Sequence, residues 1–390
     1  MIKVLFISHW YPHRYDKMYG LFVQKHAEAV SQFCEVQVLC VQPDSSLKNF
    51  EVVETERNGF NEMMVYYPAK TNNIYQRTLK TFNYIRAFWK GFRYLDKQGY
   101  KPDIVHANVL TRTAVFAYLL KIWNGIPYVI TEHWSRYLAT RNGFNGVIRK
   151  FVTSIVVRNA EAVLPVSENL KLAMQAHNLQ NKNYIIVNNV VDDFFFEEIP
   201  EVHRTKKRII HVSCFDEQAK NVKGILRATY ELSQLRDDFE LMLIGTGIDF
   251  EDVINYANLL DFPKGVIHFL REKTPKEVAN WMKNSDFFVL FSNFETAGVV
   301  ISESLVCGKP VISTKVGAAP DYINSGNGKL IDVGDEKALL SEMYYLLDNL
   351  EKYNSESIKL NAKDKFSYSS IGNELHTIYN KCIARNNSVQ

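Results

Sequence analysis

The chain has 390 residues, of which 46% are hydrophobic and 23% charged, a composition typical of a soluble globular protein. This length favours two domains, and the composition excludes a disordered or collagen-like chain. The net charge of +3 provides no overall field that would indicate nucleic acid as a partner.

The cysteine pattern and the apolar runs indicate a cytoplasmic protein. Five scattered cysteines form no Cys-x-x-Cys pair, which favours reduced thiols over a disulfide framework or a zinc site. The N-terminal sequence MIKVLFISHWYPH contains too short an apolar run for a signal peptide, and we interpret it as a first strand. No stretch approaches the roughly 18 uninterrupted apolar residues that would predict a transmembrane helix.

Short apolar runs alternate with segments of helical length, which predicts parallel sheets covered by helices. In the first half we expect strands at Lys3–Ser8, Val36–Val41, Asp103–Asn108, Pro127–His133, Ala162–Ser167 and Tyr184–Asp192. The polar stretch Asp192–Arg208 interrupts this pattern and is interpreted as a linker. The second half predicts strands at Ile209–Phe215, Glu240–Gly247, Val266–Leu270, Asp286–Ser292 and Lys309–Thr314.

These patterns predict an α/β protein with two Rossmann-like domains, over residues 1–195 and 205–365. Ligands of open parallel sheets bind at the carboxyl ends of the strands, so the expected site is a cleft across which the two domains face each other. The final helical segment, 366–386, is expected to return to the first domain. Its apolar positions Ile371, Leu375 and Ile378 have the spacing of a buried stripe.

The basic stretch Asn72–Lys101 predicts a long helix rich in aromatic residues. At helical spacing, one broad apolar stripe contains Leu79, Phe82, Ile85, Phe88, Trp89 and Phe92. One interpretation is a core helix with solvated lysines. The other is a helix that rests on an anionic membrane surface, as basic amphipathic helices do. The second interpretation predicts a cytoplasmic protein that is peripheral on the inner face of the membrane.

The segment LIGTG contains Gly245 and Gly247, but Phe250 occupies the third position of a Gly-x-Gly-x-x-Gly pattern. We therefore do not expect a nicotinamide dinucleotide site.

The stretch FETAGVVISESLVCGKPVIST, residues 294–314, places Glu295 and Glu303 on either side of Gly298. A strand–turn–helix with Gly298 at the helix start presents free N–H groups to an anion. Carboxylates slightly further away can accept hydrogen bonds from sugar hydroxyls. The pattern therefore fits a sugar–diphosphate ligand, and the alternative is an amphipathic helix with two incidental glutamates.

The longer segment FSNFETAGVVISESLVCGKPVISTKVGAAPDYI resembles the donor-site signature of the family-4 glycosyltransferases, which have the GT-B fold. The resemblance extends roughly from Lys3 to Ile378. It implies that Glu295 contacts hydroxyls of the transferred sugar and that Glu303 holds the nucleotide ribose. It also implies that backbone amides near Gly298 and Val299 contact the diphosphate or the sugar.

A second segment, HVSCFDEQAKNVKGILRA, resembles the loop of this family that brings an arginine and a lysine to the diphosphate. Lys220 matches the lysine. The arginine position falls at Cys214 or Phe215, so the chain departs from the family pattern there. Lys223 and Arg271 are the candidate substitutes for the missing charge.

The resemblance implies three further residues in the N-terminal half. His133, in TEHWS, matches a histidine near the sugar and the cleaved bond, and His106 in DIVHAN is a further candidate. Gly20 matches a loop glycine that lets the backbone approach the donor diphosphate. With Glu295 and Lys220, His133 makes up the expected catalytic set.

We therefore expect a retaining glycosyltransferase that uses a nucleotide-diphosphate sugar as co-substrate and a saccharide or lipid-linked acceptor. The absence of an Asp-x-Asp string favours a metal-independent site without a cofactor. Similar enzymes often build bacterial surface polysaccharides or glycolipids. A sugar-nucleotide epimerase, a phosphorylase and a non-catalytic nucleotide-binding partner remain as alternatives.

Overall fold

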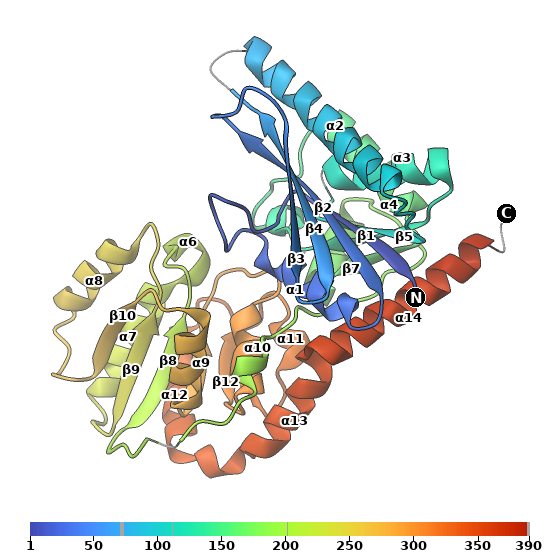
Figure 1. The fold of residues 1–390 in the computed structure, drawn as a ribbon. Coiled ribbons are helices and arrows are strands. Elements are labelled where there is room, and N and C mark those ends of the chain that lie inside the picture. Colours follow the sequence, from blue (N-terminus) through green and yellow to red (C-terminus); the bar gives the residue numbers. More distant parts are fainter. Residues whose placement is uncertain (71–73, 111, 201, 388–390) are drawn as a thin grey trace. The chain divides into compact units, whose positions relative to one another are not determined.

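The computed structural model describes residues 1–70, 74–110, 112–200 and 202–387, with side chains for all of these except 74–77 and 387. The chain forms two compact units, each with its own sheet and core (Figure 1). Unit 1 comprises residues 1–166, 170–190 and 368–390, and unit 2 comprises residues 167–169 and 191–367.

The sheet of unit 1 has the order β3-β4-β2-β1-β5-β6-β7, and all neighbours are parallel except β3 and β4. Its strands are β1 Lys3–Ser8, β2 Glu35–Asp44, β3 Glu51–Arg57, β4 Phe60–Pro68, β5 Ile104–Asn108, β6 Tyr128–Glu132 and β7 Ala162–Pro165. The central strands are almost continuously buried, as expected for a parallel sheet with helices on both faces.

The structure differs from the sequence-based prediction of this sheet at two places. The expected strand Tyr184–Asp192 is not a strand. An isolated bridge between Val163 and Tyr184, and a hydrogen bond from the Val187 N–H to the Pro165 carbonyl, join this region to the sheet edge. The antiparallel hairpin of β3 and β4 was not predicted. Its turn is Asn58-Gly59, with φ angles of 35° and 86°, which is the residue pair favoured in two-residue hairpin turns.

The helices of unit 1 include two that pack against each other although they lie at opposite ends of the sequence. They are α1, Leu21–Ser31, and α14, Tyr368–Asn387. A Cβ atom on Gly372 of α14 would lie 2.2 Å from the carbonyl oxygen of Ala29, so only glycine permits this approach. The predicted stripe of α14, Ile371, Leu375 and Ile378, is buried in the core of unit 1.

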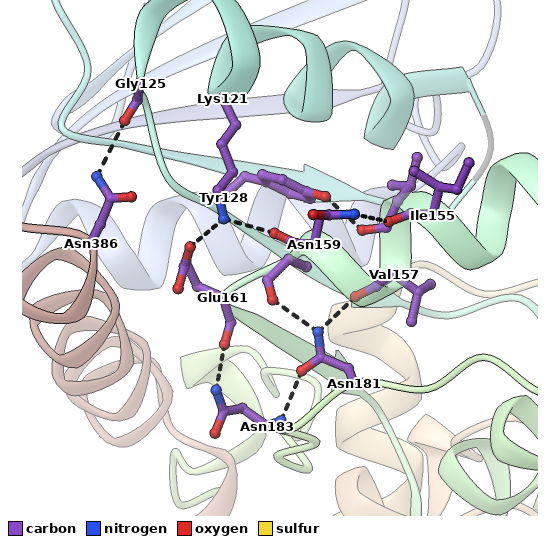
Figure 2. Close-up of polar contacts among 12 residues, drawn as sticks. Lys121, Gly125, Tyr128, Ile155, Val157, Asn159, Glu161, Asn181, Asn183 and Asn386 are labelled. Carbon is purple, nitrogen blue, oxygen red and sulfur yellow. Dashed lines mark hydrogen bonds and ion pairs between the residues drawn. The ribbon is translucent and has the colours of Figure 1, made fainter. Parts of the chain in front are cut away.

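The remaining helices of this part of the chain are α2 Ile74–Lys97, α3 Arg112–Asn124, α4 Val147–Asn159 and α5 Glu168–Ala176. Three side chains hold the C-terminal carbonyl groups of α4, which a helix leaves without internal partners. Figure 2 shows Asn181 donating to the carbonyl of Val157 at 2.6 Å and Lys121 donating to that of Asn159 at 2.9 Å. Tyr128 donates to the carbonyl of Val156 at 2.5 Å. The end of α4 is therefore fixed to α3, β6 and the segment after α5.

The buried face of α2 differs from the predicted stripe. Tyr84, Ala87, Phe88 and Leu95 are at most 2% exposed, whereas Phe82 is 55% exposed and Leu79 and Ile85 are each 41% exposed. Tyr75 and Arg77 also belong to the basic, aromatic stretch Asn72–Lys101, but their side chains lie outside the described residues. Because α2 carries aromatic and aliphatic residues on two faces, periodicity did not distinguish the face that packs on β2 and β4.

None of the helices in the described part of the chain is long and apolar enough to cross a membrane.

The sheet of unit 2 has the order β10-β9-β8-β11-β12-β13 and is entirely parallel. Its strands are β8 Lys207–Val212, β9 Phe239–Ile244, β10 Ile267–Arg271, β11 Phe287–Leu290, β12 Val311–Thr314 and β13 Gly328–Ile331, the last of which was not predicted. Its helices are α6 Glu217–Lys220, α7 Val222–Ser233, α8 Phe250–Leu259, α9 Pro275–Lys283, α10 Val299–Val306, α11 Ala319–Tyr322, α12 Glu336–Asp348 and α13 Ser355–Phe366. Short 3-10 turns lie at Ser135–Tyr137, Asp193–Phe195 and Leu350–Lys352.

The glycines of LIGTG have a packing explanation in unit 2. A Cβ atom on Gly245 would lie 1.9 Å from the carbonyl oxygen of Ser213, and one on Gly247 would lie 2.4 Å from that of Phe215. Both glycines therefore let the loop after β9 approach the loop after β8, and neither requires a dinucleotide.

Candidate functional site

The predicted donor residues Lys220 and Glu295 contact each other in unit 2. Lys220 ends the short helix α6, and Glu295 lies in the turn between β11 and α10. The Lys220 Nζ donates to Glu295 Oε1, and the two side chains are 15% and 11% exposed. Ser292 Oγ also donates to Glu295 Oε1, at 2.9 Å. The carboxylate is therefore held in one orientation by two donors.

Asn293 fixes the distance between the two loops that carry this ion pair. Its backbone N–H donates to the carbonyl of Ala219 at 2.8 Å, and its side-chain amide donates to that of Gln218 at 3.0 Å. These bonds join the turn before α10 to α6, directly beside Lys220. Sequence reasoning missed Asn293 and Ser292, although both lie in the motif segment.

Gly317 provides the space in which Glu295 lies. A Cβ atom on Gly317 would be 2.7 Å from the Glu295 Cβ, and the φ angle of Gly317 is 55°. A larger residue there would displace the carboxylate and would also strain the backbone. Sequence reasoning did not assign a role to Gly317, although it is visible as the glycine of the segment KVGAAP, directly after β12.

The helix α10 begins at Gly298, whose φ and ψ angles of 73° and 55° are left-handed. Within the described residues no side chain caps this N-terminus, and its first turn, which begins with Val299, contains no acidic residue. Glu303 lies one turn further along the helix, with its side chain half-buried. The structure thus places an uncapped helix start, suited to an anion, in the same segment as Glu295 and Glu303.

The arginine of the family pattern corresponds to Cys214 or Phe215, and the structure places one of these residues at the surface and the other in the core. Phe215 is fully buried in the core of unit 2, so this position cannot present a charge to solvent. Cys214 is exposed. Lys223, a proposed substitute for the arginine, lies 2.5 Å from Asp252 Oδ2. Arg271, the other substitute, stacks over Phe250 at 5.0 Å, with its side chain 68% exposed.

In unit 1, Gly20 starts α1 where the chain passes very close to the loop after β1. A Cβ atom on Gly20 would lie 2.3 Å from the carbonyl carbon of Trp10, and the φ angle is 66°. The glycine is therefore required for folding independently of any ligand. Two residues later, the Phe22 ring packs against the His133 ring with centroids 4.1 Å apart, so the structure brings Gly20 and His133 into one region.

His133 lies at the carboxyl end of β6, and 7% of its surface is exposed. Burial lowers its pKa well below the ordinary value, and His26 and His106 lower it further. The imidazole is therefore neutral at pH 7. Within the described residues its Nε2 atom has no hydrogen-bond partner. A neutral ring with one nitrogen unsatisfied is suited to hydrogen bonding with a substrate hydroxyl.

Glu132, which sequence reasoning did not assign, organises the loop that carries His133. Its buried carboxylate accepts hydrogen bonds at 2.8 Å from the backbone N–H groups of Leu110, His133 and Trp134. Burial raises the pKa of Glu132, and these hydrogen bonds oppose that effect.

His106, the other candidate histidine, differs from His133 because both of its ring nitrogens have hydrogen-bond partners within the protein. It is fully buried, with Nδ1 2.6 Å from Tyr379 Oη and Nε2 2.6 Å from Thr131 Oγ1. Both ring nitrogens are thus used to join β5 to β6 and α14.

Two family models match this chain and together cover both units. The model "Glycosyl transferase 4-like domain" matches residues 23–189, and "Glycosyl transferases group 1" matches residues 193–364. The chain belongs to the family-4 glycosyltransferases of the GT-B fold.

Known glycosyltransferases are similar over most of this chain. N-acetyl-alpha-D-glucosaminyl L-malate synthase of Bacillus anthracis is 27% identical over 71% of this chain and 74% of its own. A Campylobacter jejuni 4-alpha-N-acetylgalactosaminyltransferase, which is named for a diphospho-undecaprenol substrate, is 26% identical over 57% of this chain and 61% of its own. The structure of HepE from Anabaena in complex with UDP and glucose superposes with a TM-score of 0.69 at 14% identity, covering 98% of this chain and all of that one.

Proposed function

We propose that this glycosyltransferase moves a sugar from a nucleoside diphosphate to a hydroxyl of a saccharide or lipid-linked acceptor, with retention of anomeric configuration. The observation that carries the proposal is the Lys220–Glu295 pair beside the uncapped start of α10. A cation from α6 is thereby brought together with the helix N–H groups and carboxylates of the α10 segment in unit 2. These groups match the diphosphate and the hydroxyls of a sugar nucleotide.

The residues of unit 2 have separate roles in this proposal. Lys220 and the amides near Gly298 and Val299 stabilise the negative charge that develops on the departing diphosphate. Glu295 accepts hydrogen bonds from hydroxyls of the transferred sugar, and Glu303 accepts them from the ribose. No cofactor beyond the sugar nucleotide is needed, because these groups neutralise the leaving group.

In the proposed reaction, the bond between the anomeric carbon and the diphosphate oxygen breaks, and a bond to the acceptor oxygen forms on the same face. The acceptor proton passes to the departing phosphate oxygen. In unit 1, His133 is assigned to hydrogen bonding near the reacting sugar, because its neutral ring has an unsatisfied Nε2. Positioning and electrostatic stabilisation supply the acceleration.

The named activities of the relatives support a role in the synthesis of bacterial glycolipids or surface polysaccharides. One of them acts on a diphospho-undecaprenol substrate, and the HepE structure contains UDP and glucose. For this chain we accordingly propose a cytoplasmic location, peripheral on the inner face of the membrane, where a lipid-linked acceptor is within reach.

The test is a thermal-shift panel of nucleoside diphosphate sugars, followed by product analysis with the ligand that stabilises the protein. A ligand at 100 times its Kd stabilises the folded state by about 2.7 kcal/mol. The proposal predicts a new glycoside whose anomeric configuration, determined by NMR, equals that of the donor. Conversion of the donor without any acceptor would instead identify an epimerase, and release of a sugar phosphate would identify a phosphorylase. Binding without turnover in any acceptor mixture would identify a non-catalytic partner.

A further inference from the structure

A cavity of about 780 Å³ lies wholly within unit 1, beside the loop after β1, α3, the loop after β6 and α4. Four cations contribute to its wall: Lys80, Arg112, Arg136 and Arg149. No carboxylate is among the described residues that line it. A wall with four cations and no acid indicates an anionic ligand.

Arg136 is the innermost of these cations, because only 9% of its surface is exposed. Its guanidinium carbon lies over the Trp134 ring, 3.0 Å from the centroid, and among the described residues its Nε has no hydrogen-bond partner. Glu132 is nearby, but its oxygens accept the three backbone N–H groups described above. A buried guanidinium with an unsatisfied N–H is energetically unfavourable unless an anion completes the site.

The other cations lie close enough to act on His9 and Arg136. Burial is the main cause of the lowered pKa of His9 in the cavity wall, and Arg112 and Lys80 lower it further. Burial likewise lowers the pKa of Arg136, and Arg149 contributes in the same direction. The four cations therefore lie in one region of unit 1, where Glu132 opposes the effect of Arg149 on the pKa of Arg136.

The edge of the cavity on α4 is apolar. Ile148 and Val152 line the cavity, and Ile148 is 81% exposed. Val147 and Phe151, next to them on the same helix, are 85% and 66% exposed. An exposed aliphatic and aromatic helix face beside a cationic interior matches a ligand that has an anionic head and a hydrocarbon chain.

We propose that this cavity binds the phosphate or diphosphate of an amphiphilic acceptor, with Arg136, Arg112, Arg149 and Lys80 contacting the phosphate and α4 contacting the hydrocarbon. The inference rests on the proposed transferase function, and it adds the chemical class of the acceptor. It assigns the acceptor phosphate to this cavity of unit 1, whereas the sugar nucleotide is assigned to the residues of unit 2.

The experiment measures binding of farnesyl diphosphate, farnesol and a nucleoside diphosphate to the full-length protein by calorimetry. The variants are Arg136→Gln, Arg112→Gln and Arg149→Gln, with Arg158→Gln as a matched control that is exposed on the same helix. Each cavity variant should weaken farnesyl diphosphate binding by roughly tenfold or more, because a charge-assisted hydrogen bond is lost. Nucleoside diphosphate affinity should not change, whereas Lys220→Gln should weaken the nucleoside diphosphate and leave farnesyl diphosphate unaffected.

Several results would overturn the inference. Farnesol that binds as tightly as farnesyl diphosphate would show that the cations do not contact the phosphate. Equal losses in Arg158→Gln would indicate a nonspecific charge effect. The exposed Arg112 and Arg149 variants keep the test valid if Arg136→Gln does not fold. Because these are binding measurements, they are independent of turnover: a protein that binds farnesyl diphosphate as described but transfers no sugar would contradict the proposed function alone.

Discussion

Lys220 and Glu295 form an ion pair that joins α6 to the turn before α10, so the two groups proposed to contact the phosphate and the sugar of one donor neutralise each other. A donor diphosphate that binds Lys220 as proposed would compete with Glu295 for the lysine. The released carboxylate is then available to accept hydrogen bonds from the sugar hydroxyls. Binding of the complete donor would therefore exchange one ion pair for two sets of ligand contacts.

This relationship predicts that Glu295→Gln and Glu303→Gln have different effects. Glu295→Gln frees Lys220, so the affinity for a bare nucleoside diphosphate should be maintained or increased while turnover falls at least tenfold. Glu303→Gln should reduce that affinity by roughly tenfold or more, because a charge-assisted bond to the ribose is worth about 1.5–3 kcal/mol. Calorimetry with the nucleoside diphosphate, alongside kcat measurements, distinguishes the two. Glu231→Gln, at an exposed position of α7, is the matched control. Equal losses of affinity in both variants would disprove the division of roles.

A second prediction concerns which cation replaces the family arginine at Cys214. Lys220→Gln should weaken nucleoside diphosphate binding by about 1.5–3 kcal/mol and leave the bare nucleoside nearly unaffected, because the lost interaction is with the phosphates. Lys223 is paired with Asp252, and Arg271 stacks on Phe250. Lys223→Gln and Arg271→Gln should therefore have smaller effects.

The control for this prediction is Lys264→Gln, at an exposed position of unit 2. A loss in Lys223→Gln or Arg271→Gln as large as in Lys220→Gln would identify that residue as the substitute. Affinity and turnover of wild-type level in Lys220→Gln would place the phosphate site elsewhere.

The sheets could be predicted from the sequence because buried parallel strands are continuous apolar runs, as in β1 and β11. The edge hairpin of β3 and β4 was missed because β3 is largely exposed and polar, although its Asn58-Gly59 turn was a recognisable signal. The candidate carboxylates Glu295 and Glu303 could be proposed from the sequence because they lie in one local motif. The bonds from Asn293 to α6, and the stacking of Arg136 on Trp134, depend on tertiary contacts that a motif does not contain.

Buried histidines predict a loss of stability at mildly acidic pH. Burial lowers the pKa of His26 and of His211 to about 4, and that of His133 and His106 well below the ordinary value of 6.5. The unfolded chain therefore binds protons near pH 6.5, whereas in the folded chain His26 and His211 bind them only near pH 4, and His133 and His106 only well below pH 6.5. The contribution of these histidines to stability is complete above pH 6.5 and decreases as the pH falls below it. His26 and His211 should each contribute a loss of roughly 1 kcal/mol between pH 7.5 and 5.5, and His133 and His106 a loss of the same sign.

Urea unfolding at pH 7.5 and 5.5 measures this dependence. In His26→Gln the amide can replace the donor that contacts the Asn188 carbonyl at 2.9 Å, so the pH dependence should decrease by about 1 kcal/mol. His203→Gln, at an exposed position, should retain the wild-type dependence. An unchanged pH dependence in His26→Gln would contradict the assigned cause.

The outer face of α2 predicts binding to anionic membranes. Leu79, Phe82 and Ile85 are 41%, 55% and 41% exposed on this helix. Arg86 and Lys90 also lie over the Phe50 ring, at 5.4 and 5.5 Å from its centroid. Exposed apolar residues among cations are typical of helices that lie in the membrane interface. The exposure of this face removes the explanation that the aromatic residues of α2 serve the core alone.

The measurement is co-sedimentation of the full-length protein with vesicles of anionic or neutral lipid at low and high salt. Each Lys or Arg near an anionic surface contributes about 1 kcal/mol, so the triple variant Arg86→Gln, Lys90→Gln, Arg93→Gln should bind roughly 100-fold more weakly. A matched triple variant in unit 2, Lys264→Gln, Lys276→Gln, Lys337→Gln, removes the same charge from exposed positions and should bind like the wild type. Phe82→Ala should reduce binding at both salt concentrations, because its contribution is apolar. If the wild-type protein did not sediment with anionic vesicles even at low salt, α2 would not be a membrane-binding helix, and a soluble acceptor would be favoured.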